Sequence, residues 1–331
     1  MSRRPKVMNF QKRRILVISI AVVMIVFNVL LAIGHVSPVE AQSSLAANSI
    51  SSITEYSTPG GDPWGTAFDA SGRVWVALPG CDGQACSSSN GLGKLALFDP
   101  GTQGWTSVVL PTGYGQPLFV AVDHNGKVWF TMPATNAIAK YDPVSATVSQ
   151  WAVPTASAGP WGIAIDLQGK IWFTENPDTV ALIGEYTSQG ALNEYKIRNS
   201  STGGTGLTPH LITIDHNGNI WWSEGWVAMI GKLTVANAQP GTNSGVSEFH
   251  YPAPCTNCGT HTSGIGASSD GLIWFDDSLQ CIVGHFSLST KAWKLYNTPT
   301  SGSHSHDGLA VDSSNRIWFD EEFANKLGEV V

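Results

Sequence analysis

The sequence predicts an all-β fold, a six-bladed β-propeller built from four-stranded antiparallel blades. A motif that fits or nearly fits D-x-x-G-x-[VI]-W recurs six times after residue 60. Its tryptophans are 43 to 54 residues apart, which suits a blade of four short strands. Helical repeats are usually shorter and follow a period of about 3.6 residues, which this chain does not show. The six copies are Asp69–Trp75, Asp123–Trp129, Asp166–Trp172, Asp215–Trp221, Ser268–Trp274 and Asp312–Trp318.

The third copy shows how each part of a repeat forms a strand. The apolar, β-branched run Gly162–Ile165 predicts an inner strand that is packed on both faces. Asp-x-x-Gly then predicts a hairpin, because the Asp side chain bonds the turn backbone and Gly adopts positive φ at little cost. The chain returns through Ile171–Phe173, and Ile183–Tyr186 and Asn193–Ile197 supply the third and fourth strands. The aromatic rings would fill the space between neighbouring blades.

The two ends of the repeat region predict how the ring closes. Ile53–Pro59 resembles the fourth strand of the other repeats, yet no blade precedes it. The last repeat stops at Leu327–Val331, after a third strand. We therefore expect the N-terminal strand to complete the last blade, which removes two exposed strand edges. Residues 53–331 then form one propeller domain, and residues 42–52 a flexible lead-in.

Residues 1–41 have the composition of an export segment. Six Lys or Arg side chains precede the apolar run Ile15–Val36, and Val39–Ala41 matches the small-x-small pattern of a cleavage site. The segment is either a signal peptide or an uncleaved signal anchor, since the apolar run approaches the roughly 20 residues that span a bilayer. Both interpretations place the propeller outside the cytoplasm, either secreted or held at the membrane by residues 15–36.

The charge of the exported part limits its partners. Without residues 1–41, 12 basic and 24 acidic side chains are left. This negative balance argues against nucleic acid as a partner. We expect instead a monomer that binds a small molecule or a cyclic peptide at the mouth of its central channel.

Five cysteines stand outside the repeat motif. In an exported protein, Cys81 and Cys86 are expected to form a disulfide within an insertion rich in Gly and Ser. Cys255 and Cys258 precede the first strand of the fifth blade and Cys281 follows its second, so we expect one of the first two to pair with Cys281. The alternative is a zinc site, because thiolate and imidazole are zinc ligands. Its ligands would be Cys255, Cys258, His261 and Cys281.

Two columns of residues are predicted to face one mouth of the channel. The first and second strands of a blade are antiparallel, so the start of one and the end of the other lie on the same face. Five residues before the start of the motif, the six blades carry in order Trp64, Leu118, Trp161, His210, Ser263 and Asp307. Three residues after its Trp, they carry Leu78, Met132, Glu175, Glu224, Asp277 and Glu321. The first two blades are therefore apolar at this mouth, and the other four are acidic.

The crowding of acids predicts a cation site. Like charges held together cost energy unless a cation or a proton offsets them, and carboxylate oxygens suit Mg²⁺ or Ca²⁺. The predicted metal ligands are Glu175, Glu224, Asp277, Asp307 and Glu321. Further polar residues lie next to the two columns, namely His261, His304, His306, Asp276 and Asp320. The competing interpretation is that the acids are solvated or cap turns and that the histidines are ordinary loop residues.

The repeat resembles a known family. Trp-Phe-Thr-Glu at 172–175 is followed by Ile-Gly-x-Tyr at 183–186 and preceded by Pro-Trp-Gly-Ile-Ala-Ile-Asp at 160–166. This combination is similar to the repeats of the virginiamycin B lyase (streptogramin lyase) family, and the resemblance covers about residues 53–331. It implies a carbon-oxygen lyase that opens a cyclic depsipeptide by elimination across its ester linkage, with Mg²⁺ as electrophile and a His as base.

In that family, a channel His and a Glu fourteen positions later belong to one blade. His210 and Glu224 match this spacing, and Asp307 and Glu321 match it with an acid in place of the His. The family also has an acid two positions before its His and a second His in the preceding blade. Here those places hold Thr208 and Trp161 for the first pair, and Ser305 and Ser263 for the second.

The resemblance assigns roles to these residues. A divalent ion held by Glu224 and Glu321 would polarise the carbonyl next to the ester, and His210 or His306 would remove the α-proton as catalytic base. The apolar flank of the substrate would contact Trp64, Leu118, Met132 and Trp161. Two alternatives stay open: a metal-dependent lactonase or esterase, and a non-catalytic propeller that binds a peptide, glycan or protein. No G-x-S-x-G motif is present, which argues against a serine hydrolase.

Overall fold

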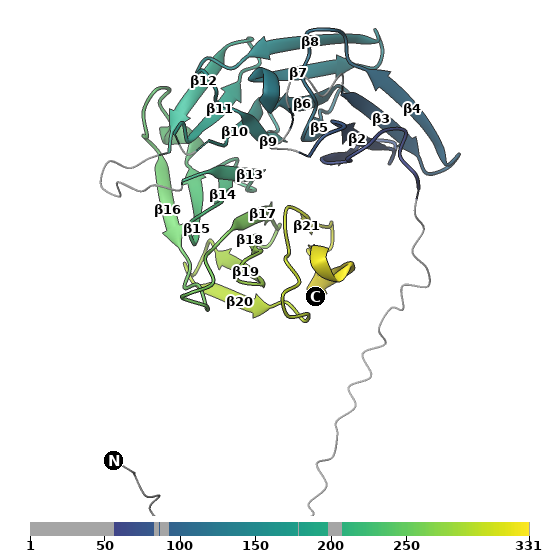
Figure 1. The fold of residues 1–331 in the computed structure, drawn as a ribbon. Coiled ribbons are helices and arrows are strands. Elements are labelled where there is room, and N and C mark those ends of the chain that lie inside the picture. Colours follow the sequence, from purple (N-terminus) through teal and green to yellow (C-terminus); the bar gives the residue numbers. More distant parts are fainter. Residues whose placement is uncertain (1–55, 83–85, 87–92, 178, 198–206, 331) are drawn as a thin grey trace, which may run out of the picture. The chain divides into compact units, whose positions relative to one another are not determined.

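The computed structural model of the chain describes residues 56–330 except 83–85, 87–92, 178 and 198–206. Ser57–Val331 make up one compact unit. Its described part forms six antiparallel sheets, which Figure 1 shows following one another around a common centre. The 3₁₀ helices described there are single turns: Pro133–Thr135 (η3), Val235–Asn237 (η4) and Glu322–Ala324 (η5). The predicted all-β, six-bladed propeller is confirmed.

The first three blades are four-stranded sheets whose strands follow one another in chain order. Blade one contains β1 (Thr66–Phe68), β2 (Val74–Leu78), β3 (Lys94–Asp99) and β4 (Gly104–Val109). Blade two contains β5 (Val120–Val122), β6 (Val128–Met132), β7 (Ala137–Asp142) and β8 (Thr147–Ala152). Blade three contains β9 (Pro160–Ile165), β10 (Ile171–Glu175), β11 (Leu182–Tyr186) and β12 (Leu192–Lys196).

The fourth and fifth blades follow the same order, and the sixth has three strands within the described residues. Blade four contains β13 (Pro209–Ile214), β14 (Ile220–Glu224), β15 (Met229–Leu233) and β16 (Val246–His250). Blade five contains β17 (Thr262–Ala267), β18 (Leu272–Asp277), β19 (Ile282–Ser287) and β20 (Trp293–Asn297). Blade six contains β21 (Ala310–Val311), β22 (Ile317–Glu321) and β23 (Lys326–Val330).

Closure of the sixth blade by the N-terminal strand stays a prediction. Residues 53–55 of the proposed closing strand lie outside the described residues, and residues 56–58 are not in a strand. The predicted export segment, residues 1–41, and the lead-in, residues 42–52, also lie outside them. Among the residues that are described, no helix is long and apolar enough to cross a bilayer.

The repeat motif is held together by its own Asp. In blade three, the backbone N–H groups of Gln168 and Lys170 donate to Oδ1 of Asp166, each at 2.9 Å. The indole N–H of Trp172 donates to Oδ2 at 2.9 Å, and Gly169 supplies the positive φ of the turn. One carboxylate therefore fixes both the hairpin and the orientation of the large ring. The same carboxylate bonds recur at Asp123, Asp215 and Asp312, with Asn315 in place of the turn glycine in the last of these.

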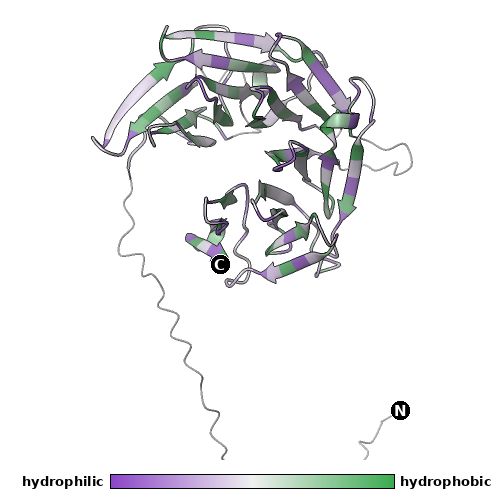
Figure 2. Ribbon diagram, turned by 180° about the vertical axis from the view of Figure 1, so that it is seen from behind, coloured by the Kyte–Doolittle hydropathy of each residue, from purple (hydrophilic) through white to green (hydrophobic). Residues whose placement is uncertain are grey.

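Burial falls from the second strand of a blade to its fourth. All residues of β6, β10 and β14 are buried, whereas β4 and β16 are mostly half-buried or exposed. Figure 2 shows hydrophilic residues interspersed along the outer strands. The core therefore lies between the inner strands of adjacent blades, where sheets pack face to face.

The side chains of a second strand alternate between the two neighbouring blades. Trp172 packs with Ile212 and Trp222 of blade four. The next residue, Phe173, packs with Trp129 and Ile138 of blade two. Because successive side chains point to opposite faces of a sheet, residues near the end of a second strand also face a neighbouring blade. This alternation decides where the predicted carboxylates lie.

One of the two predicted disulfides is present, and the other is replaced by a different pairing. Cys81 and Cys86 form a disulfide, as expected. Cys255 bonds to Cys258, so the predicted pairing of one of them with Cys281 is wrong, and Cys281 is a free thiol. Cys255 and Cys258 are three residues apart, close enough to bond within one loop. The alternative zinc site fails for the same reason, since two of its four ligands are joined in a disulfide. Two disulfides are typical of proteins in oxidising compartments.

Candidate functional site

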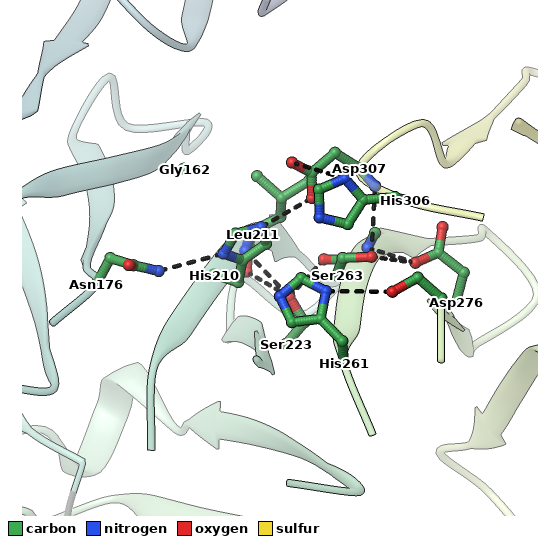
Figure 3. A network of polar contacts seen from close by, with 12 residues as sticks. Gly162, Asn176, His210, Leu211, Ser223, His261, Ser263, Asp276, His306 and Asp307 are labelled. Atoms are coloured by element: carbon green, nitrogen blue, oxygen red, sulfur yellow. Dashed lines mark hydrogen bonds and ion pairs between the residues drawn. The ribbon is translucent and has the colours of Figure 1, made fainter. Parts of the chain in front are cut away.

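Four histidines from three blades meet at one mouth of the channel. His210 lies on β13, His261 comes directly before β17, and His304 and His306 lie in the segment before β21. The ring centre of His261 is 5.2 Å from that of His210 and 5.0 Å from that of His306. The rings of His304 and His306 are 5.2 Å apart. Figure 3 shows the rings of His210, His261 and His306 turned toward one another.

A bulge in the first strand places His210. Pro209 pairs with Glu224 and Ile212 with Trp222, so two residues of β13 oppose the single residue Ser223. A bulge re-aims the side chain that it carries, here toward the channel. The same irregularity occurs in blades three and five, at Trp161 and at Ser263. The first predicted column therefore coincides, in these blades, with the bulged residues.

A hydroxyl bridge joins each bulge to the preceding blade. Oγ1 of Thr174 accepts the N–H of Gly162 in its own blade at 2.9 Å and donates to the carbonyl of His210 in the next blade at 2.7 Å. Thr131 makes the same bridge to the carbonyl of Trp161, and Ser223 to that of Ser263. These bonds satisfy the backbone groups that the bulges release from the ladder.

Both ring nitrogens of His210 are engaged. Nε2 lies 2.9 Å from Oδ1 of Asp307, and Nδ1 lies 3.2 Å from the amide nitrogen of Asn176. An amide nitrogen donates, so Nδ1 accepts and the proton is placed on Nε2, facing the carboxylate. The indole ring of Trp161 packs beside the imidazole at 5.6 Å. His210 is therefore held firmly, with no ring nitrogen left for a ligand unless one bond is exchanged.

His261 is buried at the back of the cluster. Its Nδ1 lies 3.3 Å from the hydroxyl of Ser278, and the ring of Trp226 packs on it at 4.6 Å. Burial lowers the pKa of His261 to about 3, and repulsion from the protonated forms of His210 and His306 adds to the decrease. The imidazole of His261 is therefore neutral at physiological pH.

Asp307 supplies the negative charge of the cluster. Burial by itself raises the pKa of Asp307. Attraction to the protonated form of His210 and the hydrogen bond from its ring, with help from His306, outweigh burial and lower this pKa. Its Oδ2 atom is buried without a hydrogen-bond partner and lies 3.9 Å from Nδ1 of His306. Asp307 has φ +62° and His304 φ +54°, so this segment holds two residues in the left-handed region. Such strain is common at functional sites.

Asp276 of β18 lies behind the cluster. Its Oδ1 accepts the hydroxyl of Ser263 and the N–H of Gly264, both at 2.7 Å, and Oδ2 accepts the hydroxyl of Ser305 at 3.1 Å. Burial raises the pKa of Asp276 to about 7, and repulsion from Asp307 adds to the rise. In the repeat, Asp276 stands where Thr174 and Ser223 stand in earlier blades, so a carboxyl replaces the bridging hydroxyl here.

Two cavities share Trp64 and His306 in their walls. The smaller, of about 310 Å³, is lined by all four histidines together with Trp64, Trp161 and Trp226. The larger, of about 720 Å³, runs along the first strands of all six blades and also contacts Phe119 and Asp307. The rings of Trp64, Phe119 and Trp161 lie within 6.2 Å of one another and form an apolar wall that meets the histidines at His210. The site thus has one apolar and one polar side.

The predicted substrate-binding residues are only partly brought together. Trp64 and Trp161 line the cavities as expected. Leu118 and Met132 are buried and line neither cavity, and Met132 belongs to the core between blades one and two. Sequence reasoning missed Phe119, Trp226 and Asn176. Asn176 directly follows the second column and Trp226 lies two residues beyond it, so a wider window around each column would have found them.

Four of the five predicted metal ligands do not join the imidazole rings, although Asp277 accepts the backbone N–H of His261, because their strands turn the carboxylates into the layers between blades. Oε1 of Glu224 accepts the indole N–H of Trp222 at 2.5 Å, and the carboxylate of Glu321 accepts the N–H and hydroxyl of Thr300 at 3.1 and 2.9 Å. Asp277 accepts the hydroxyl of Tyr251 at 2.5 Å and three backbone N–H groups.

Glu175 is fully buried, and neither carboxylate oxygen has a hydrogen-bond partner. Burial raises the pKa of Glu175 to about 9, so it is protonated at neutral pH. Asp307 is the one predicted ligand that lies among the histidines. The expected convergence of carboxylates is therefore not found, and a Mg²⁺ site of oxygen ligands does not fit these residues.

Two groups in the described part of the chain have ligand atoms close enough for a metal ion. One consists of His210, His261 and His306, and the other of His304, His306 and Glu322. Within each group the ligand atoms lie within 4.8 Å of one another. Both groups are rich in imidazole and share His306, so they could not both be filled at once.

Comparison with known proteins identifies the family. The model of the Virginiamycin B lyase family matches residues 51–241, more than half of the chain. The chain belongs to the virginiamycin B lyase family. No curated protein matches it.

Solved structures of virginiamycin B lyases are similar to the chain. A streptogramin B lyase is 25% identical, with a TM-score of 0.69 over 83% of this chain and 81% of that one. A virginiamycin B lyase from Staphylococcus aureus is 24% identical, with a TM-score of 0.67 over 81% of this chain and 80% of that one. A catalytically inactive variant of the Staphylococcus aureus enzyme, with quinupristin, is 23% identical, with the same TM-score and coverage. The last two support the fold alone.

The family's His and Glu pair is only partly reproduced. The pairing of Pro209 with Glu224 confirms that His210 and Glu224 lie at the same end of one hairpin. The carboxylate that is hydrogen-bonded to the ring of His210, however, belongs to Asp307 of blade six. This virginiamycin B lyase family member therefore combines the family fold with a histidine-rich channel mouth.

Proposed function

We propose that this protein opens an ester or lactone ring by elimination, at the channel mouth where the histidines face the tryptophan wall. The observation that carries the proposal is the group His306, Asp307 and Trp64 around one cavity, in a chain of the virginiamycin B lyase family. An imidazole beside an ionised carboxylate is suited to accept a proton, and the aromatic wall is suited to an apolar peptide ring.

His306 is the proposed catalytic base. It lines both cavities, and 28% of its side chain is exposed to solvent, so a substrate can reach it. His210, the other candidate base, has both ring nitrogens bonded within the protein and is proposed to hold Asp307 in place. Asp307 stabilises the imidazolium that forms when His306 accepts a proton, because its charge lies 3.9 Å away.

The proposed reaction needs no water. His306 removes the proton from the carbon adjacent to the carbon that bears the ester oxygen; a carbon-carbon double bond forms, the carbon-oxygen bond breaks, and the ester leaves as a carboxylate. Substrate and product therefore have the same mass. The Mg²⁺ that the family resemblance implies would polarise the neighbouring carbonyl, but the carboxylates expected to hold it do not fit, and no step is assigned to it.

We also propose that the protein works outside the cytoplasm as a monomer. The two disulfides and the composition of residues 1–41 support an oxidising location. The ligand is a small molecule or cyclic peptide at the channel mouth, and the acidic balance of the chain disfavours nucleic acid.

The test uses the full chain and a streptogramin B-type cyclic depsipeptide, with products analysed by mass spectrometry. Elimination gives a linear product of unchanged mass, whereas a lactonase or esterase adds one water. His306→Ala should lower turnover by at least about 10²-fold, and His216→Ala, at an exposed position on a repeat turn, should not change it. Binding without turnover of any ester or lactone would replace the lyase proposal with a non-catalytic binding propeller.

A further inference from the structure

We propose that His210, His261 and His306 bind one transition-metal ion of the zinc class, with Asp307 as the neighbouring carboxylate. This inference differs in ligand chemistry from a Mg²⁺ site built from carboxylates. It does not depend on the lyase proposal. A nitrogen of His306 that binds the ion cannot at the same time accept a substrate proton, so the ion-bound state is distinct from the proton-accepting state of the lyase proposal.

The three imidazoles are already close to a coordination geometry. Their ligand nitrogens lie within 4.8 Å of one another, and His210 and His261 are buried. Zinc binds imidazole nitrogen at about 2.0–2.1 Å, which places two such nitrogens about 3.4 Å apart in a tetrahedral site. Shifts of about 1 Å in each ring would close the cluster around an ion. The three residues come from three blades, so the ion would also link blades four, five and six.

Polar groups outside the cluster orient two of the rings. Asn176 contacts Nδ1 of His210, and Ser278 contacts Nδ1 of His261. In both rings this leaves Nε2 as the nitrogen for the ion. Histidine ligands usually donate their second ring N–H to such a partner, which fixes the ring orientation. The hydroxyl of Ser278 can accept the Nδ1 proton of His261 as it stands. For His210 the amide of Asn176 must turn its oxygen toward Nδ1, because a ring that binds the ion through Nε2 carries its proton on Nδ1.

The carboxylate of Asp307 points to a missing positive charge. Its Oδ1 bonds to Nε2 of His210, the atom that would bind the metal, and its buried Oδ2 has no hydrogen-bond partner. A divalent ion at Nε2 would displace this proton to Nδ1, where the turned amide oxygen of Asn176 would accept it, and would give Oδ2 a partner. Three imidazoles and one carboxylate suit zinc and neighbouring transition metals better than Mg²⁺ or Ca²⁺, which prefer a shell of oxygen ligands.

The second group of ligands is a weaker candidate. Nδ1 of His304 is 2.8 Å from Oε2 of Glu322, and half of the Glu322 side chain is exposed. The ring of His304 also stacks on Phe323 at 4.3 Å. These residues are satisfied without an ion, and water competes for them. His306 is therefore expected to join the buried pair instead.

The experiment measures metal binding by the full chain after treatment with a chelator. Zn²⁺ is titrated by calorimetry, and bound metal is counted by mass spectrometry of the desalted protein. We expect one Zn²⁺ per chain and no measurable Mg²⁺ binding. His261→Ala should weaken Zn²⁺ binding at least tenfold, while His216→Ala and Cys281→Ser should not change it. When Co²⁺ replaces Zn²⁺, the wild type should show the visible absorption of a four- or five-coordinate cobalt site. His261→Ala should lack this absorption.

Two further variants keep the test decisive. His306→Gln changes a half-exposed residue and should fold even if His261→Ala does not, and it should also weaken Zn²⁺ binding at least tenfold. His304→Ala should leave binding unchanged. The proposal is overturned if folded wild type binds no Zn²⁺, or if His304→Ala loses the ion while His261→Ala or His306→Gln keeps it. Zinc binding without ester cleavage would refute the lyase proposal and leave this one standing.

Discussion

The two sides of the channel mouth share one backbone design and differ in chemistry. In blade three the bulged residue is Trp161, which joins Trp64 and Phe119 in an apolar wall. In blade four the equivalent bulged residue is His210, which bonds to Asp307. Both bulges are bridged by a hydroxyl of the preceding blade, from Thr131 and Thr174. The repeat therefore supplies position, and the single side chain at the bulge supplies chemistry.

The largest expected difference between the sides is in turnover. His306→Ala removes the proposed base and should lower kcat by about 10²–10⁴-fold, the usual contribution of general base catalysis. Trp161→Phe, on the apolar side, keeps an aromatic ring and should change kcat little. Steady-state kinetics on a cyclic depsipeptide would measure both. Equal losses in the two variants would mean that the polar side has no special role.

The histidine side should also carry a pH dependence of stability. Folding raises the pKa of Asp276 from 3.8 to about 7, so the folded protein keeps a proton that the unfolded chain releases. The stabilisation is complete below about pH 4 and is lost as the pH rises through about 7, an effect on the order of a few kcal/mol. Asp276→Asn should remove this contribution, so that stability falls less between pH 4 and 7 than in the wild type, and Asp270→Asn, at an exposed position, should not.

Chemical denaturation of chelator-treated protein between pH 4 and 8 would measure the slope. An unchanged slope in Asp276→Asn would assign the pH dependence to another group. Glu175, whose pKa is raised to about 9, is the next candidate.

The hydroxyl bridges test whether the two sides share a scaffold. Thr131→Val and Thr174→Val each leave a buried N–H and a buried carbonyl without the bridge, and each should cost about 1–3 kcal/mol of unfolding free energy. Only Thr174→Val, which releases the bulge of His210, should also lower turnover. Thermal denaturation would measure the loss of stability in both variants, and steady-state kinetics would measure the loss of turnover. If Thr131→Val impaired turnover as strongly, the bridge would act on the whole ring and not on one bulge.

The smallest expected effect distinguishes Trp64, which lines the cavities, from Leu118, which is buried in the core. Trp64→Leu should raise KM about fivefold, equivalent to about 1 kcal/mol, with kcat little changed, because Trp64 lines both cavities. Leu118→Val should instead cost about 1 kcal/mol of stability and leave KM unchanged, because Leu118 is buried. An increase of KM in Leu118→Val would instead show that Leu118 contributes to substrate binding.

The fold could be predicted because its signals are local. Asp166 and Trp172 are six residues apart, and one hydrogen bond between them explains why the motif contains both. The turn glycine and the apolar inner strand are equally close in sequence. A fold built from six copies of such a local unit can be predicted from the sequence without knowledge of contacts between distant residues.

The sequence by itself determined the six-bladed fold, the disulfide in the first insertion and the mouth at which His210, His306, Asp307, Trp64 and Trp161 meet. Only the tertiary structure decided that His261 completes the cluster and that Glu175, Asp277 and Glu321 do not. The physical reason is side-chain direction. Second-strand residues alternate between two neighbouring blades, which turns the carboxylates into the packed layers, whereas bulges and loops turn the histidines toward the channel.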